Sequence, residues 1–426
     1  MTDVTKFSKD DLLKYQEDLE YKYKEYVNHN LKLDMSRGKP GSTQLDLSNG
    51  ILDKLDNYKT EAGIDGRNYG ILDGIPEAKK LFSDLLDINE KNIIIGGNAS
   101  LNLEYDAIAR NFLFGTQGNK PWSKVENIKF LCPCPGYDRH FAMCEEFGIE
   151  MINIDMTDDG PDMDTVEKLV AEDESIKGMF CVPLYSNPEG VCYSDETVRR
   201  LAKMKTKAKD FRIMWDNAYG VHHFYGNHKV HKLLNILDEC EKANNPDRVY
   251  YFFSTSKITF PGAGVSIIAS SENNIKEIKQ HMSVQTIGFD KLNQLRIVHF
   301  FKNADGVNEH MKKLAEDLRP KFDLVLETLD RELSGTGLAT WKVPDGGYFV
   351  TVDTLEGCAK ETIELGKKAG VTLTPAGSTY PYKKDPHDSN IRLAPSYPSL
   401  EELKIAIELF CICVKLAGVK KLIEEY

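Results

Sequence analysis

The sequence lacks a long uninterrupted hydrophobic run. The most apolar stretch near its end, LFCICVKLAGV, is broken by Lys415 and is too short to cross a bilayer. The opening, MTDVTKFSKDD, is polar and lacks the apolar centre of a secretory signal. We therefore expect no membrane partner and a cytoplasmic protein.

Positive charge is also in short supply. The chain has 54 Lys and Arg against 66 Asp and Glu, which gives a formal net charge of −12. Phosphate backbones and anionic lipid surfaces repel such a protein, so nucleic acid is excluded as a principal partner. No block of one sign is long enough to form a charged tail, and the paired Lys-Lys and Glu-Glu steps are typical of a solvated surface.

Recognisable metal or disulfide spacings are missing as well. The nine cysteines are scattered, which favours free thiols in a reducing compartment. Cys132-Pro-Cys134 is not followed by a second pair, so we interpret it as a strand end. The histidines of HHFYGNHKVH do not have the spacing of a helical two-histidine site, and we predict no metal; they are His222, His223, His228 and His231.

Short β-rich apolar runs alternate with helical patterns through the first two thirds of the chain. This alternation predicts an α/β fold with a seven-stranded, mostly parallel sheet that is covered by helices on both faces. The expected strands lie in the runs 92–97, 128–132, 150–154, 178–184, 212–216, 249–253 and 265–270.

The pattern changes after about residue 306. A long helical region, 306–333, precedes a few strands with a helix near 356–369, and Ser399 with Glu402 caps a last helix. We expect residues 306–426 to form a smaller α/β domain that the N-terminal segment 1–50 joins. Residues 51–305 then form the large domain.

The turn Gly96-Gly97-Asn98-Ala99-Ser100 lies between an expected strand and an expected helix. Its free backbone N–H groups, together with the helix dipole, favour an anion such as a phosphate. Many strand-to-helix turns carry two glycines, so the turn alone is weak evidence. In the helix that follows, we expect one buried stripe formed by Leu101, Tyr105, Ile108 and Phe112.

Lys257 poses the main question of the sequence. It follows an apolar strand and precedes a Pro-Gly-x-Gly turn, in FFSTSKITFPGAG, where a buried amine needs a partner or a covalent role. Asp216 in WDNAYG and Asn187 in YSNPEG follow other expected strands. Ligands of parallel sheets bind at the carboxyl ends of the strands, so these side chains are candidates for one site.

This ordered set, with the wording SRGKP, LSNG, GGNAS and APSYPS, resembles the fold-type I pyridoxal-phosphate aminotransferases of the aspartate aminotransferase kind. The resemblance covers about residues 36 to 400. It is nearest to the divergent subgroup called type Ic, or MocR-like. It implies pyridoxal 5′-phosphate as cofactor, an amino acid and a 2-oxo acid as substrates, and a homodimer.

The resemblance also implies residue roles at the reacting centre. Lys257 would form the internal aldimine and then carry the proton. Asp216 would pair with the protonated pyridine nitrogen, because a fixed negative charge keeps the ring electron-accepting. Tyr219 and Asn187 would hydrogen-bond the phenolic oxygen, and Tyr137 would stack on the ring.

Further roles concern the phosphate. By the same resemblance, Gly97, Asn98 and Ala99 would hold it together with Ser254. Tyr69 would reach the phosphate of the neighbouring subunit. Relatives usually carry an arginine shortly after the Pro-Gly turn, where this chain has Ala263-Gly264-Val265. We expect amides, hydroxyls or another cation to replace it.

Arg392 would clamp the α-carboxylate of the substrate, helped by Asn187 and the backbone at Gly38, because an arginine fork matches a carboxylate with two parallel hydrogen bonds. Arg37, Lys39 and Arg139 are candidates for a distal carboxylate, although a surface role is the simpler interpretation of each.

The expected reaction is transfer of an α-amino group from an aspartate-like or glutamate-like amino acid to a 2-oxo acid. The cofactor motifs leave open another reaction of the same cofactor, such as β-elimination. A regulator that binds the cofactor without catalysis is a lesser alternative, because the acidic charge disfavours DNA binding.

Overall fold

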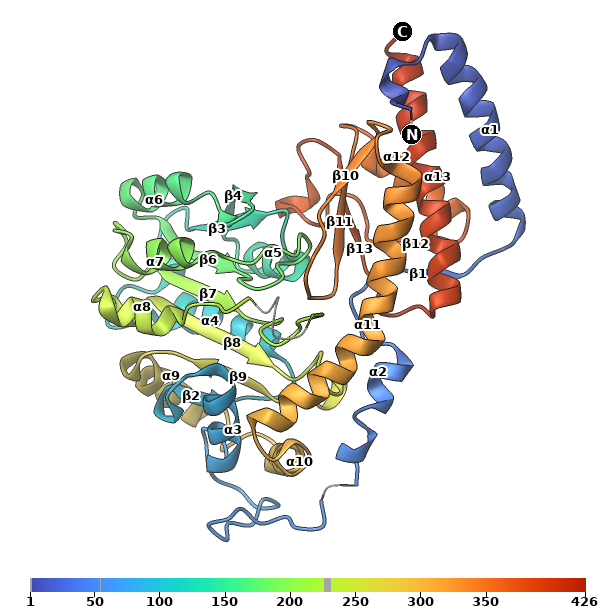
Figure 1. Cartoon of the computed structure of the whole chain (residues 1–426). Coiled ribbons are helices and arrows are strands. Elements are labelled where there is room, and N and C mark those ends of the chain that lie inside the picture. Colours follow the sequence, from blue (N-terminus) through green and yellow to red (C-terminus); the bar gives the residue numbers. More distant parts are fainter. Residues whose placement is uncertain (1, 54, 226–230) are drawn as a thin grey trace.

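The structure is a computed structural model that describes residues 2–53, 55–225 and 231–426 (Figure 1). A central sheet of eight strands has the order β2-β9-β8-β7-β6-β3-β4-β5. The strands are β2 (Ile93–Ile95), β3 (Lys129–Cys134), β4 (Glu150–Thr157), β5 (Gly160–Pro161), β6 (Ile176–Cys181), β7 (Arg212–Asp216), β8 (Val249–Ser254) and β9 (Ser266–Ala269).

The strands β8, β7, β6, β3 and β4 run parallel, whereas β9 and β5 pair with their neighbours antiparallel. The predicted α/β class and the seven predicted strands are confirmed. The sheet has one strand more than predicted, because β5 turns back against the end of β4. This two-residue strand begins at Gly160, whose φ of 122° lies in a region that favours glycine. The sequence has no apolar pattern there that would predict a strand.

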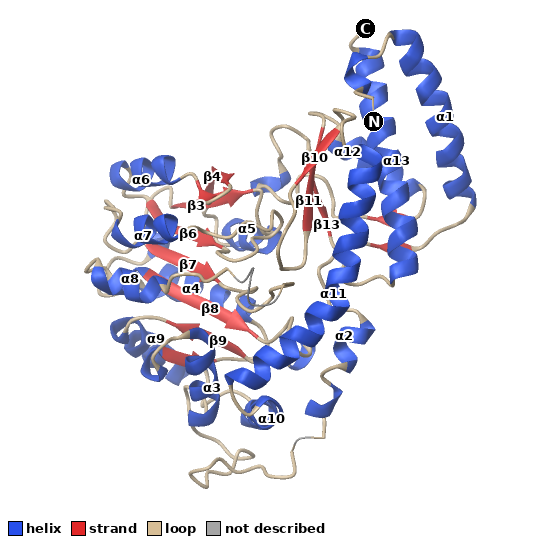
Figure 2. Cartoon of the chain, in the orientation of Figure 1, coloured by secondary structure: helices blue, strands red, loops and turns tan. Residues whose placement is uncertain are grey.

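Helices cover both faces of the central sheet (Figure 2). Alternate residues of a central strand face opposite layers of these helices. On β8, Val249, Tyr251 and Phe253 join one core, and Tyr250 and Phe252 join the other. The first core includes α3 (Pro76–Leu86), α6 (Met163–Glu172), α7 (Asp195–Lys203), α8 (Ile236–Lys242) and α10 (Lys291–Phe301). The second includes α4 (Ser100–Phe114), α5 (Asp138–Glu146) and α9 (Glu272–Gln285). The period of two along a strand therefore decides which helices a residue meets.

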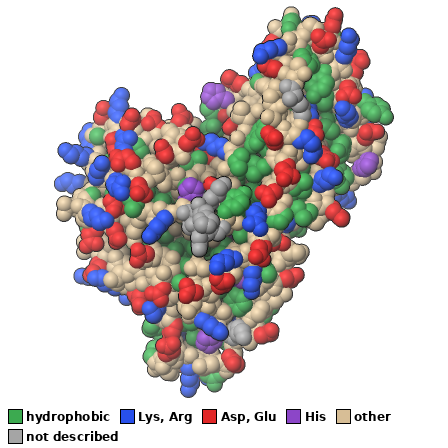
Figure 3. All heavy atoms as spheres, in the orientation of Figure 1, with side chains coloured by type: hydrophobic (Ala, Val, Ile, Leu, Met, Phe, Trp, Pro, Cys, Tyr) green, Lys and Arg blue, Asp and Glu red, His purple; other side chains and the backbone are tan. Residues whose placement is uncertain are grey.

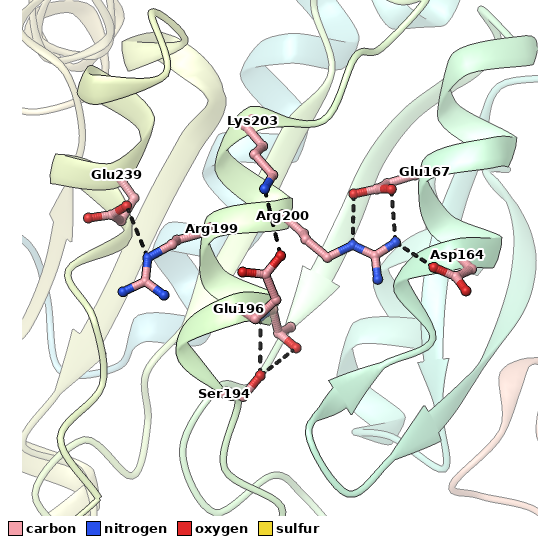
Figure 4. A network of polar contacts seen from close by, with 9 residues as sticks. Asp164, Glu167, Ser194, Glu196, Arg199, Arg200, Lys203 and Glu239 are labelled. Carbon is pink, nitrogen blue, oxygen red and sulfur yellow. Dashed lines mark hydrogen bonds and ion pairs between the residues drawn. The ribbon is translucent and has the colours of Figure 1, made fainter.

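Side chains of α7 link it to the helices on either side (Figure 4). Arg200 donates two hydrogen bonds to Glu167 and one to Asp164, both on α6. Arg199 lies 4.0 Å from Glu239 on α8. Such solvent-exposed ion pairs contribute little to stability, so the buried apolar faces hold this layer in place.

A second unit contains the C-terminal third of the chain and its N-terminal helix. Its antiparallel sheet has the order β10-β11-β13, and α1 packs beside α13 (Figure 1). The elements are α1 (Lys9–Asn28), β1 (Leu33–Asp34), α2 (Ser42–Asp46), α11 (Ala304–Leu333), β10 (Ala339–Trp341), β11 (Val350–Thr354), α12 (Ala359–Lys368), β12 (Val371–Thr372), β13 (Asn390–Leu393) and α13 (Leu400–Glu424). The short strands β1 and β12 pair in parallel.

Helix α11 connects the two units. Val307 near its start packs in a core of the large sheet, whereas Leu318 and Phe322 pack in the core of the C-terminal unit. We keep residues 1–50, 51–305 and 306–426 as our proposed domain division; α11 begins at Ala304, two residues before the last of these boundaries.

The surface carries charges of both signs, and the cysteines are unpaired. Acidic and basic side chains are interspersed on the face that Figure 3 shows. All nine cysteines are free thiols. Across the described residues, no helix combines the length and the apolar character that crossing a membrane requires.

Candidate active site

The three strand-end residues lie at one edge of the central sheet. Asp216 is the last residue of β7, Lys257 follows the end of β8, and Asn187 follows β6. Because β6, β7 and β8 are adjacent and parallel, their carboxyl ends meet at that edge. The predicted clustering of these three positions therefore agrees with the topology.

A cavity of about 920 Å³ opens at this edge. Its walls come from both units of the molecule. Among the residues predicted from the sequence, those that line it are Gly38, Tyr137, Asn187, Tyr219, Lys257 and Arg392, together with the three candidates for a distal carboxylate, Arg37, Lys39 and Arg139. Phe349, which directly precedes β11, also lines it.

Two side chains contact the backbone carbonyl of Lys257. Its carbonyl accepts a hydrogen bond from the Tyr348 hydroxyl at 3.3 Å and lies 3.3 Å from Nε2 of His222. The Lys257 amine lies 4.9 Å from the centre of the Tyr219 ring. The segment is therefore fixed while the amine faces the cavity.

Two tyrosines stand on the cavity wall. Tyr219 is buried, and burial together with the nearby Asp216 charge raises its pKa above the ordinary value. Tyr137 directly precedes α5, and burial raises its pKa to about 12, against the opposing effect of the Lys257 charge. Both phenols therefore remain protonated at neutral pH and can donate hydrogen bonds.

Arg392 presents part of its guanidinium without a partner. Its Nη1 donates to Oδ1 of Asp138 and to Oδ1 of Asn187, each at 3.1 Å. Its Nε is buried and has no hydrogen-bond partner among the described residues. An arginine that is only 6% exposed and keeps a free donor can bind a carboxylate.

Gly38 lies against the same wall. A Cβ atom on Gly38 would come within 2.5 Å of Cζ of Phe349, whose ring lies 4.9 Å from the Arg392 guanidinium. Only glycine fits this approach without displacing Phe349. Its backbone therefore lies where a molecule bound to Arg392 can contact it.

The glycine turn and the serines after β8 form a neighbouring polar cradle. Ser256 donates to the Asn98 carbonyl at 2.9 Å, and Ser254 donates to Ser256 at 3.1 Å. The Gly97 carbonyl accepts from the backbone of Ser266 at 2.8 Å. These contacts turn the carbonyls away, so the N–H groups of Asn98, Ala99 and the start of α4 remain for an anion.

Tyr69 lies apart from the other predicted residues. It belongs to the loop before α3, is 81% exposed and does not line the cavity. The loop is held at Gly70, whose carbonyl accepts a hydrogen bond from Lys291 at 3.0 Å. Within one chain Tyr69 therefore contributes nothing to the site.

Asp216 lies below the cavity floor in a buried line of three polar side chains. Its Oδ2 is 3.3 Å from Nε2 of His140, and the same nitrogen is 3.2 Å from Oε2 of Glu104. Its Oδ1 is buried and has no partner in the part of the chain that the structure describes. This oxygen can accept one further hydrogen bond.

Three comparisons place the chain among known proteins. The profile of the family described as aspartate amino-transferase matches residues 7–426. The chain belongs to the aspartate aminotransferase family. A putative aminotransferase of Mycolicibacterium smegmatis is 47% identical over 422 residues, which cover 98% of each chain. An aspartate aminotransferase of Corynebacterium glutamicum is 45% identical over 407 residues, covering 95% of this chain and 94% of the relative.

A solved structure agrees. The crystal structure of an aspartate transaminase from Corynebacterium glutamicum matches with a TM-score of 0.96 at 43% identity, over 99% of both chains. The predicted aminotransferase activity and fold type are therefore confirmed. Assignment to the type Ic or MocR-like subgroup stays a prediction.

Glu104 and His140 of this aminotransferase were missed by the sequence reasoning. The stripe predicted for α4 is wrong in phase, because its buried residues are Ser100, Leu103, Glu104, Ala107, Ile108 and Asn111. Tyr105 is instead 42% exposed and packs on Phe147. His140 could have been suspected from its position in CPGYDRH, three residues after Tyr137.

The electrostatics of the buried line follow from its isolation. Burial and the Asp216 charge raise the pKa of Glu104 to about 7. Burial alone would lower the pKa of His140, but the Glu104 and Asp216 carboxylates outweigh it and raise the value to about 10. His140 is therefore an imidazolium at neutral pH.

These three side chains also have the ligand types of a metal site, with one ligand atom each within 4.8 Å of the others. We interpret them as an ion-paired line, because Nε2 of His140 lies within 3.3 Å of both carboxylates. The HHFYGNHKVH histidines have other partners: His223 contacts Tyr185 at 2.6 Å and His231 lies 3.5 Å from Asp345. His228 lies outside the described residues.

Proposed function

We propose that this chain is a pyridoxal-phosphate-dependent aminotransferase that moves an α-amino group from an aspartate-like or glutamate-like amino acid to a 2-oxo acid. One observation carries the proposal. Lys257 and Arg392 share one cavity, while Asp216, which does not line that cavity, keeps a buried carboxylate oxygen without a partner among the described residues.

The residues present fit the cofactor. The free Oδ1 of Asp216 can accept a hydrogen bond from a protonated ring nitrogen. The N–H groups of Gly97, Asn98 and Ala99, with the Ser254 hydroxyl, suit a phosphate. When bound, pyridoxal phosphate supplies an aldehyde carbon and an electron-accepting ring.

Around the ring, Tyr137 and two hydrogen-bonding side chains have defined tasks. Tyr219 and Asn187 would donate to the phenolic oxygen, since burial keeps the Tyr219 phenol protonated. Tyr137 would cover one face of the ring from the start of α5. Lys257 would bind the aldehyde carbon and, once released, carry a proton between two carbon atoms.

The substrate carboxylate has its own receptor. Nε of Arg392 has a free donor, and Asn187 fixes Nη1 of the same guanidinium at 3.1 Å. The backbone at Gly38 would add a contact beside Phe349. A bidentate arginine also orients the amino acid, so that its amino group points towards Lys257.

The stretch Ala263-Gly264-Val265 does not supply the arginine that relatives place there. Nδ2 of Asn293 donates to the Ala263 and Gly264 carbonyls at 2.8 Å each, which fixes the turn. We propose that the phosphate rests on backbone amides and on the hydroxyls of Ser254 and Ser256.

The charge of the cavity supports a dicarboxylic substrate. Six lining residues are cationic and three are acidic. The cations are Arg37, Lys39, Arg139, Lys257, Lys383 and Arg392, and the acids are Asp138, Glu145 and Glu146. The name aspartate aminotransferase given to the Corynebacterium relative agrees with this preference. We propose that Arg37 and Arg139 attract the distal carboxylate.

We also propose a homodimer with shared sites in the cytoplasm. Tyr69, Val284 and Ile287 are exposed by 81%, 90% and 59%, and the Gly70 backbone lies against Gly288. These apolar residues thus gather on one surface beside the Gly97 turn, from which Tyr69 would reach the phosphate of the partner subunit. The free thiols agree with a reducing compartment.

The test is covalent trapping. The purified protein is incubated with pyridoxal phosphate, reduced with borohydride and digested, and the modified peptide is identified by mass. We expect one adduct per chain, on Lys257, and its loss together with at least about 10²-fold of the activity in Lys257→Ala. Lys279→Ala, which removes an exposed lysine paired with Asp73, is the control and should keep both. An adduct elsewhere, or none, rejects the proposal.

The same preparation decides between reactions. Amino-group transfer converts the bound cofactor to its amine form with an amino acid alone and needs a 2-oxo acid to turn over. Release of pyruvate and ammonia without that acceptor would indicate β-elimination. A gel shift with DNA in a protein without turnover would indicate a regulator.

A further inference from the structure

The buried line behind Asp216 ends in a carboxylate that the proposed reaction does not use. Glu104 on α4 is 1% exposed, His140 on α5 is 2% exposed, and Asp216 on β7 is 4% exposed. Apart from the 3.2 Å contact with His140, neither oxygen of Glu104 has a hydrogen-bond partner within the described ranges. A carboxylate in such a place is destabilising unless a cation compensates it.

The surroundings of the line are closed to other charges. The Phe180 ring stacks on His140 at 4.3 Å and 5°, and the Tyr137 ring meets its edge at 5.0 Å. The charged groups that face Glu104 are His140, Asp216 and, at longer range, Lys257. Tyr250 on β8, against which α4 packs, bonds to Asn111 and Thr116 instead.

The charges of the three groups can be added for the form in which Glu104 is ionised. Two carboxylates and one imidazolium give −1, in a site from which water is excluded. A protonated ring nitrogen at the free Oδ1 of Asp216 brings the sum to zero. Without Glu104, an imidazolium beside Asp216 would leave one positive charge too many once that nitrogen is bound.

We propose that Glu104 is a positioning residue that acts through His140: its carboxylate holds His140 as an imidazolium and gives the line the single negative charge that a protonated ring nitrogen neutralises. This inference rests on the proposed function. Its consequence concerns where the proton lies. The imidazolium contacts Oδ2, so a ring proton would meet Oδ1, which has no other partner among the described residues.

The variant that separates charge from shape is Glu104→Gln. Glutamine keeps the length and the polar end of the side chain but removes the charge. His140 then loses its proton near neutral pH, and Asp216 keeps only a neutral donor. The matched control is Glu277→Gln on α9, which removes a carboxylate bonded to Thr116 and Gln117 away from the line.

The first measurement follows the imidazole itself. Nitrogen NMR of the holoenzyme with labelled histidine, assigned by the signal lost in His140→Gln, reports both ring nitrogens. We expect His140 to remain doubly protonated at pH 8 in the parent protein and in Glu277→Gln, and to become neutral in Glu104→Gln. Doubly protonated His140 in Glu104→Gln would overturn the proposal.

The second measurement is the affinity of the cofactor-free protein for pyridoxal phosphate at pH 6 and pH 7. Glu104 is partly protonated there before binding, since its pKa is about 7, and an arriving ring proton favours its ionised form. Affinity in the parent should therefore rise by about fivefold relative to Glu104→Gln over that unit of pH. Parallel curves would overturn the proposal.

Other outcomes are distinguishable. If borohydride fixes no cofactor on Lys257 of the parent protein, the proposed function fails first. If Lys257 is labelled in both proteins but the NMR signal and the affinity curves coincide, only the role of Glu104 fails. A stoichiometric metal ion in the purified parent that is absent from Glu104→Gln would also overturn the role, since the line would then be a metal site.

Discussion

The Asp216 end of the candidate site is closed, whereas the Arg37 and Arg139 side of the cavity is open to solvent. Asp216, His140 and Glu104 are all buried by more than nine-tenths. Arg37 and Arg139 are exposed, although they line the same cavity as Lys257. A charge in the buried line has to be balanced by a fixed partner, whereas an exposed arginine is balanced by water and salt.

This difference separates two tasks. In our proposal the buried end decides whether the chemistry is possible at all, because it would fix the protonation of the group that binds to Asp216. The open side decides which molecule stays bound, because a screened charge contributes about 0–1 kcal/mol and can be tuned without unfolding anything. Substitutions at the two ends should therefore affect different kinetic constants.

The largest effect is expected for Asp216→Asn. The amide is close in shape but carries no charge, so the ring proton has no fixed acceptor. We expect kcat to fall by about 10²–10³-fold, and by the same factor for every amino acid tested. Steady-state kinetics with aspartate, glutamate and alanine measure this. A fall in kcat for only one of these substrates would contradict the distinction between the buried end and the open side.

A smaller and selective effect is expected for Arg37→Gln and Arg139→Gln. Each removes an exposed cation from the cavity, so KM for aspartate and glutamate should rise by about two- to fivefold, as for a screened ion pair. KM for alanine, which has no distal carboxylate, should not change. Addition of 0.5 M NaCl to the parent protein should reduce this difference between substrates, since salt screens exposed charges.

Equal changes for alanine and aspartate would mean that Arg37 and Arg139 act on the fold or on the α-carboxylate. Lys39→Gln is a useful companion, because Lys39 lies over the Tyr397 ring at 3.7 Å and is already engaged. We expect little kinetic change there.

The smallest effect is expected at His222, between the two ends. Burial lowers its pKa to about 3, so the imidazole is neutral during catalysis, and its Nε2 contacts the Lys257 carbonyl. Between pH 6.5, the ordinary pKa of histidine, and the folded-state pKa of about 3, His222 binds a proton in the unfolded chain but not in the folded chain. The free energy of unfolding therefore decreases as the pH falls through this range. His222→Gln should flatten this acid loss and leave the pH profile of kcat unchanged.

Urea unfolding of the cofactor-free protein at pH 7.5 and pH 5 measures this difference for the parent and His222→Gln. A steeper loss in the variant, or a displaced limb of the kcat profile, would show that His222 carries charge in the folded protein. His222 would then have to be counted with the buried charged groups at the Asp216 end of the site.

The sheet was predictable because its strands are apolar on both sides. Each of the seven predicted runs overlaps a strand, since a strand covered on both faces leaves a nearly continuous hydrophobic signature. The strand β5 was not predictable in this way, because two residues at a turn bury too little to leave a pattern. Lys257 and Asp216 could be brought together from the sequence because parallel strands share an edge.

The buried line was not predictable by the same reasoning. Met214 and Asp216 share a face of β7, and Met214 packs in the core with α4 and α5. That alternation could have directed Asp216 towards those two helices. The phase of α4 could not be read, because its buried stripe contains Glu104 and Asn111, and hydrophobicity favoured Tyr105 instead. A buried polar residue is recognisable only with its partner, and that partner is distant in the chain.

Helix α11 gives the molecule a mechanical property. One end packs with the sheet that carries Lys257, the other with the unit that carries Arg392, and Pro320 lies inside the helix near the point where the packing changes. A proline has no N–H to complete the helical ladder there, so bending is easiest at that turn. Bending of α11 at that turn would change the distance between the sheet that carries Lys257 and the unit that carries Arg392.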